Sequence, residues 1–152
     1  MTRFRFAIFV LAVVLPLILP AGGAEAKDRS VHAPGGIALA GYDPVAYFSE
    51  GRAVRGEPAH ALRFRGAVWH FTSSGNLSAF EADPMSYFPQ FGGYCVWALA
   101  QGEAVPGNPE YWTILSGRLY LSADPAARAR LRDAPGDVIA RAAAHWPPGR
   151  RP

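Results

Sequence analysis

The sequence contains very little cysteine: Cys95 is the only one among 152 residues. A single cysteine excludes an intramolecular disulfide, so its thiol is free, pairs with another molecule or serves as a ligand. The fold must therefore be held together by its hydrophobic core alone. Nine Phe, six Tyr and four Trp make such a core possible, because each aromatic side chain buries a large area.

The motifs of several well-known enzyme classes are also missing. The sequence has no C-x-x-C, no H-E-x-x-H, no G-x-S-x-G and no glycine-rich phosphate loop. We therefore favour binding over catalysis, while the question of enzymatic activity stays open. The net charge is only +3 and the arginines are scattered rather than gathered in a stripe, so we expect no nucleic-acid partner.

The first 26 residues have the pattern of a secretory signal peptide. A basic start precedes an apolar run over 6–19, and an A-x-A cleavage site follows at 24–26. The run falls short of the roughly 20 apolar residues that span a bilayer, and Pro16 interrupts it. We expect cleavage of 1–26, a periplasmic or secreted location, and no membrane association afterwards.

The rest of the chain predicts a small single α+β domain with two β-hairpins and three or four short helices. Leu62 and Phe64 alternate with arginines at the strand period of two, which indicates a hairpin over 62–71. A second hairpin is expected over 111–121, around a Ser-Gly turn. N-cap residues and apolar spacing indicate the principal helices. These are expected at 75–82, 125–134 and 138–146.

The domain boundaries follow from composition. The polar, glycine-ended segment 27–36 is expected to be a flexible leader, 37–147 the domain, and 148–152 a proline- and arginine-rich tail. No internal repeat is recognised in the sequence.

The segment 69–95 holds a histidine, a capped helix, an aromatic cluster and the cysteine. It resembles the YHS domain, a small module of the TRASH-like, treble-clef metal-binding group. The residues that match the YHS pattern are Trp69, His70, Phe71, Ser73, Phe80, Pro84 and Tyr87.

Two further runs are similar to exported, stand-alone YHS-domain proteins, a branch that includes selenoproteins. They are GYDPVAYF at 41–48 and PQFGGYC at 89–95, and the similarity extends to 144–147. The resemblance implies a treble-clef or YHS-like core and an exported binding protein. It also implies that a metal ion or a partner protein is bound.

The chain departs from this family where the family binds metal. The positions that match the family's cysteine ligands hold Ala46, Thr72 and Asn76. None of these side chains supplies a thiolate, so the usual sulfur-rich tetrahedral zinc site cannot form through them.

Cys95 and His70 are the remaining candidates for a metal site. A thiolate binds soft metals such as Cu(I), and an imidazole could complete a two-coordinate copper site or lower the thiol pKa. Our first hypothesis is therefore a soft-metal binding protein, with copper as the possible cofactor. The second is a thiol-redox protein in which Cys95 reacts with an external thiol. The third is a structural or interaction domain in which the cysteine is a small buried hydrophobe.

Asp43 lies in a Gly-Tyr-Asp-Pro sequence. We expect its side chain to form a turn by accepting hydrogen bonds from nearby backbone amides, rather than to act as a base.

Overall fold

The fold of residues 30–146, described by a computed structural model, is built from two antiparallel β-hairpins and several short helices. This confirms the predicted α+β class. The predicted signal peptide, at 1–26, and the predicted tail, at 148–152, lie outside the described residues. In the part of the chain that the structure covers, no helix is long and apolar enough to cross a membrane.

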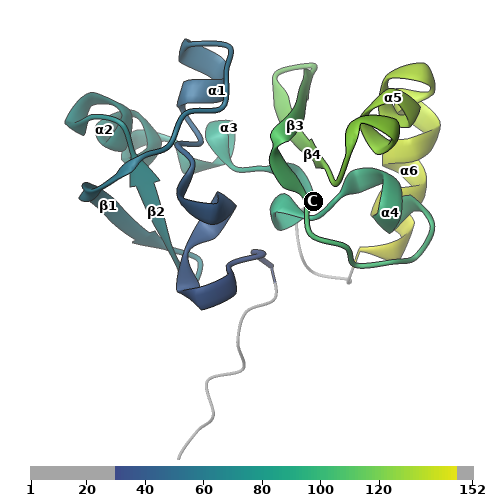
Figure 1. Cartoon of the computed structure of the whole chain (residues 1–152), viewed down its shortest axis with the longest axis horizontal. Helices are drawn as coiled ribbons and strands as arrows, with labels where there is room; N and C mark the ends of the chain where they lie inside the picture. Colours follow the sequence, from purple (N-terminus) through teal and green to yellow (C-terminus); the bar gives the residue numbers. More distant parts are fainter. Residues whose placement is uncertain (1–29, 147–152) are drawn as a thin grey trace, which may run out of the picture.

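The N-terminal elements form one side of the molecule (Figure 1). A short turn, Pro34–Gly36 (η1), precedes a second turn, Ala38–Gly41 (η2), and a one-turn helix, Ala46–Ser49 (α1). The first hairpin pairs Glu57–Phe64 (β1) with Ala67–Phe71 (β2). The helices of this side follow the hairpin. They are Ser74–Ala82 (α2) and Pro84–Tyr87 (α3).

The C-terminal elements form the other side (Figure 1). The turn Gln90–Gly93 (η3) leads into the helix Val96–Ala100 (α4). The second hairpin pairs Asn108–Leu115 (β3) with Arg118–Ser122 (β4). The last two helices complete the fold. They are Pro125–Asp133 (α5) and Pro135–His145 (α6).

The two sides repeat one order of elements, a turn, a short helix, a hairpin and two helices, and this repeat was not predicted from the sequence. We call η2 to α3 the N-terminal repeat and η3 to α6 the C-terminal repeat. In each repeat, strands of eight and five residues are followed by a nine-residue helix. Each hairpin turns through two residues with positive φ, Arg65-Gly66 in one and Ser116-Gly117 in the other, which suits the right-handed twist of the strands.

The turn that opens each repeat shows the same copy at the level of single hydrogen bonds. Leu39, Ala40 and Gly41 all have positive φ, as do Phe91, Gly92 and Gly93. The carbonyl of Gly41 then accepts from the N–H of Gly56, and the carbonyl of Gly93 from that of Gly107. One backbone path is thus used twice, and a position in one repeat has a definite counterpart in the other.

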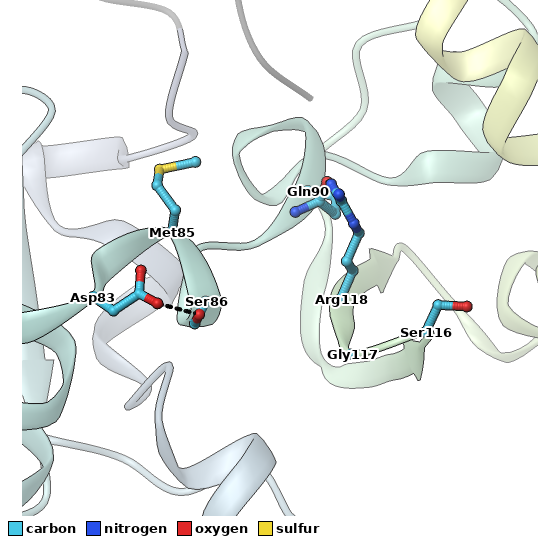
Figure 2. A pocket seen from close by; sticks show the side chains of 7 residues that line it. All are labelled: Asp83, Met85, Ser86, Gln90, Ser116, Gly117 and Arg118. Carbon is cyan, nitrogen blue, oxygen red and sulfur yellow. Dashed lines mark hydrogen bonds between the residues drawn. The ribbon is translucent and has the colours of Figure 1, made fainter.

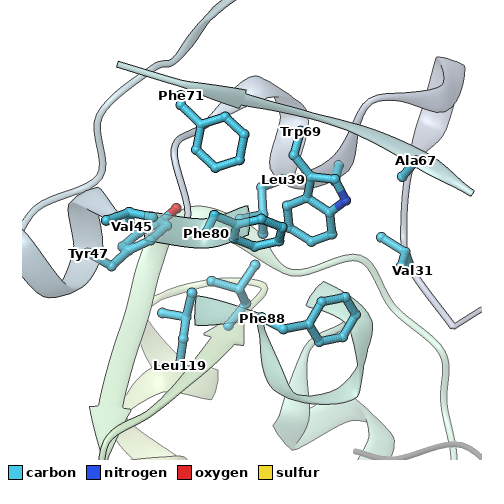
Figure 3. Packing of buried hydrophobic residues seen from close by; sticks show 12 residues of the cluster. Val31, Leu39, Val45, Tyr47, Ala67, Trp69, Phe71, Phe80, Phe88 and Leu119 are labelled. Atoms are coloured by element: carbon cyan, nitrogen blue, oxygen red, sulfur yellow. The ribbon is translucent and has the colours of Figure 1, made fainter. Parts of the chain in front are cut away.

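The principal hydrophobic cluster is rich in aromatic rings and lies mainly in the N-terminal repeat (Figure 3). Trp69 and Phe80 are fully buried, with ring centroids 5.3 Å apart. A second cluster in the C-terminal repeat gathers around Phe91 and Trp146, whose ring centroids are 5.6 Å apart.

Strand β4 contributes to both clusters. Leu119 and Leu121 belong to the principal cluster, whereas Tyr120 between them belongs to the second. This follows from the two-residue period of a strand, which directs alternate side chains to opposite faces. Four of the five residues of β4 are buried, so the strand lies inside the molecule.

Polar contacts also join the repeats. The Tyr42 hydroxyl donates to the Glu110 carboxylate over 2.7 Å, and the buried Tyr47 hydroxyl donates to the Pro109 carbonyl over 3.1 Å. Burial, followed by the charge of Glu110, raises the pKa of Tyr47 far above its usual range.

The described part of the predicted leader, residues 30–36, packs on the domain. Val31 is buried in the principal cluster, and the N–H of His32 donates to the carbonyl of Gly92 over 2.8 Å. The folded domain therefore begins before the predicted start at residue 37.

Candidate functional site

Asp43 is the most highly coordinated side chain in the N-terminal repeat. It is fully buried and lies just before α1. Its Oδ1 accepts from the backbone N–H of Val45 over 2.8 Å and from that of Ala46 over 3.4 Å. This is the turn-forming role expected from the sequence, since a carboxylate that precedes a helical turn satisfies its free amides.

The second oxygen of Asp43 connects α1 to β2 and α2, which the sequence did not predict. Oδ2 accepts from the Thr72 N–H over 2.8 Å, the Thr72 hydroxyl over 2.9 Å and the Asn76 amide over 2.7 Å. The same amide nitrogen of Asn76 donates to the Thr72 hydroxyl over 3.0 Å. Two positions where the YHS resemblance expects thiolate ligands therefore carry polar groups that bind Asp43 instead. We call Asp43, Thr72 and Asn76 the carboxylate network.

Cys95 is the counterpart of Asp43 in the C-terminal repeat. The N–H of Asp43 donates to the carbonyl of Val54, and the N–H of Cys95 donates in the same way to that of Val105. The thiol sulfur accepts from the Ala98 N–H over 3.5 Å, at the start of α4. Sulfur is a weak acceptor, so Cys95 caps its helix by a weaker interaction than Asp43 does.

The surroundings of Cys95 lack the polar partners of Asp43. When the two hairpins are aligned, Ala123 takes the position of Thr72 and Ala127 takes the position of Asn76. The N-cap bonds support this alignment, because Ser73 accepts from Asn76 as Asp124 accepts from Ala127. Cys95 has an exposed fraction of 0%, so a reagent reaches the thiol only if the structure opens.

His70 lies in the other half of the molecule. It is half-buried on β2, where it pairs with Ala61, and its Nδ1 approaches the backbone of Gly41 in η2. Strand β2, which carries His70, and helix α4, which follows Cys95, lie on opposite sides in Figure 1, and within residues 30–146 the thiol sulfur is found bonded to the Ala98 N–H and not to His70. Within residues 30–146, no group of three or more His, Cys, Asp or Glu side chains is placed to hold a metal ion.

A groove of about 500 Å³ lies between α3 and the turn of the second hairpin (Figure 2). Asp83, Met85 and Ser86 lie on one wall, and Ser116 and Arg118 lie on the other. The walls therefore carry charges of opposite sign. We call this cavity the inter-repeat groove.

Both charges of the inter-repeat groove are held by hydrogen bonds. The Asp83 carboxylate accepts from the Ser86 hydroxyl over 2.6 Å, and the Arg118 guanidinium donates to the buried Gln90 over 3.2 Å. Neither Asp83 nor Arg118 is among the candidate site residues predicted from the sequence. No sequence pattern relates these residues, because the groove forms where two different elements meet.

Comparisons with known proteins do not identify a family. No protein-family model matches the chain, and neither a curated protein nor a solved structure is significantly similar to it.

Proposed function

We propose that this chain is an exported, non-enzymatic binding domain of the YHS type, and that its inter-repeat groove receives a polypeptide segment of a partner protein. In this proposal Cys95 is a structural residue. The complete burial of its thiol is the observation that carries this choice among the three hypotheses.

The groove favours a partner segment that carries both a basic and an acidic side chain. Asp83 offers a carboxylate and Arg118 a guanidinium on facing walls, and Met85 adds an exposed apolar side chain. Complementary charges fix the orientation of a bound partner and accelerate its encounter.

The hypotheses of copper binding and thiol redox chemistry stay predictions, and one experiment separates them from the proposal. The purified protein and its Cys95→Ser variant are titrated with Cu(I) and with a thiol reagent, before and after unfolding in urea. We expect labelling only after unfolding and no stoichiometric copper. Copper that is bound by the native protein and lost in the variant would support the metal hypothesis. Rapid labelling of the native thiol would support the redox hypothesis.

The groove itself is tested by reversing one charge. The immobilised protein is exposed to the exported fraction of its own cells, with Arg118→Glu as the test variant. Arg63→Glu, an exposed residue of β1, is the matched control. We expect a partner that is retained by the wild type and by the Arg63 variant and lost with the Arg118 variant. Equal retention by all three proteins would exclude the groove as the contact site.

A further inference from the structure

A second cavity, of about 340 Å³, lies between β3 and α5 in the C-terminal repeat, away from the residues that line the inter-repeat groove. Arginine predominates among its charged residues. The lining consists of Tyr111, Pro125, Arg128, Ala129, Arg132 and Asp133. We call it the α5 cavity.

The two arginines of the α5 cavity have no carboxylate partner within residues 30–146. Both ion pairs found in this range lie elsewhere, between Arg52 and Glu50 and between Arg141 and Asp137. Arg128 and Arg132 are one helical turn apart, a spacing at which like charges repel each other. Such a pair is stabilised by any anion that lies between the two guanidinium groups.

Arg128 is also incompletely hydrogen-bonded. Its Nε is buried and has no hydrogen-bond partner in the described part of the chain. Desolvation, and then the charge of Arg132, lower the pKa of the Arg128 guanidinium. Its Cζ lies 5.9 Å from the centre of the Trp112 ring, so an aromatic face supports the group without satisfying its N–H donors.

The comparison of the two repeats shows that this arginine is unusual for its position. The corresponding residue in α2 is Leu77, which packs against the principal hydrophobic cluster. The fold therefore accepts an apolar side chain here, and the scaffold alone does not require a cation. A half-buried guanidinium with an unused donor is an arrangement suited to receiving an oxyanion.

We propose that the α5 cavity binds a small ligand through its carboxylate or phosphate group, with Arg128 and Arg132 as the contacting side chains. The planar guanidinium offers paired N–H donors that match the spacing of two oxygens in such a group. The exposed Asp133 at the same cavity disfavours highly charged anions, so we expect ligands of one or two negative charges.

The test measures the melting temperature and the binding isotherm of the full chain with inorganic phosphate and, separately, with succinate. Ionic strength is held constant, because salt alone screens the repulsion between the arginines. Saturable binding of either probe is expected, and the preferred probe distinguishes a phosphate ligand from a carboxylate ligand. Arg128→Leu should weaken the binding at least tenfold and still fold, since leucine occupies the same place in α2.

Two further variants complete the design. Arg132→Gln should also weaken binding, and it serves as the test should the Arg128 variant fail to fold. Arg130→Gln is the control, because Arg130 lies on the same helix, does not line the cavity and contacts the Trp97 ring instead. The proposal is overturned if neither probe binds saturably, or if the Arg128 and Arg132 variants both bind as the wild type does. Arg118→Glu should leave anion binding intact, so this site and the inter-repeat groove are tested separately.

Discussion

The carboxylate network makes a sharp prediction about stability. Replacing Asp43 by Ala removes an acceptor that receives hydrogen bonds from Val45, Ala46, Thr72 and Asn76. The donors that remain lie in or beside a buried site, because the Asp43 side chain is fully covered. Water therefore does not replace the lost acceptor without a rearrangement of α1, β2 or α2.

The expected cost follows from the number and kind of these hydrogen bonds. A hydrogen bond to a charged group contributes about 1.5–3 kcal/mol, and part of this sum is offset because a buried carboxylate is costly to desolvate. We expect Asp43→Ala to lower the free energy of unfolding by about 4 kcal/mol, a large share of the roughly 5–15 kcal/mol that stabilises a typical domain. Asp43→Asn keeps one oxygen and should cost about half as much.

Cys95 supplies a matched control at the corresponding place in the other repeat. Cys95→Ala removes one weak hydrogen bond and one buried sulfur, so it should cost only about 1 kcal/mol. Urea unfolding, followed by tryptophan fluorescence, measures all three variants on one scale. If Asp43→Ala and Cys95→Ala cost the same, the reasoning is refuted, because hydrogen bonding to the carboxylate would then add nothing.

Two further predictions concern Tyr47 and Ser116. Burial raises the pKa of Tyr47 above its usual value of 10.0, so its neutral form is favoured in the folded state and stability should fall as pH rises above 10. Tyr47→Phe should reduce that fall by up to about 1.4 kcal/mol per pH unit. At pH 8 the same variant should lower the free energy of unfolding by about 1 kcal/mol, because it loses the hydrogen bond to the Pro109 carbonyl. Urea unfolding between pH 8 and 11 measures both effects. Ser116 is exposed and has a φ of 49°, a backbone conformation that is strained for a residue with a side chain and relaxed for glycine. Ser116→Gly should therefore raise the free energy of unfolding by about 0.5 kcal/mol in the same assay. A decrease would show that Ser116 is not strained.

Local signals in the sequence were sufficient to predict the hairpins and the longer helices. Alternating side chains located β1 and β2, and N-cap residues marked the starts of helices. The structure shows the caps of α2 and α5 to be Ser73 and Asp124, whose side chains accept from backbone N–H groups. These features depend on residues close in sequence, so they can be read without knowledge of the tertiary structure.

The duplication leaves only a short trace in the sequence. Besides the Gly-Tyr pairs at 41–42 and 93–94, the repeats share the pattern G-x-A-V-x-G-x-P at 51–58 and 102–109, but their caps use different chemistry at the same place. Ser73 caps α2 where Asp124 caps α5, and Cys95 caps α4 at the position that Asp43 has in the other repeat. Outside these short runs the repeats have backbone conformation and hydrogen bonding in common, and these features become visible only in three dimensions.

The candidate sites were predicted only in part. The sequence indicated Cys95 and His70 from their chemistry, but burial and separation depend on how the two repeats pack. The inter-repeat groove and the α5 cavity are assembled from residues that no local pattern connects. Arg128 is recognisable as unusual only when it is aligned with Leu77 of the other repeat.

The position of β4 limits how independent the two repeats can be. Because Leu119 and Leu121 complete the core of the N-terminal repeat while Tyr120 serves the C-terminal one, one strand belongs to two cores. A copy of the N-terminal repeat on its own would lack part of its interior and would have to borrow an equivalent strand from another molecule. The duplicated chain carries that strand within itself, so the two halves are expected to fold and unfold as one cooperative unit.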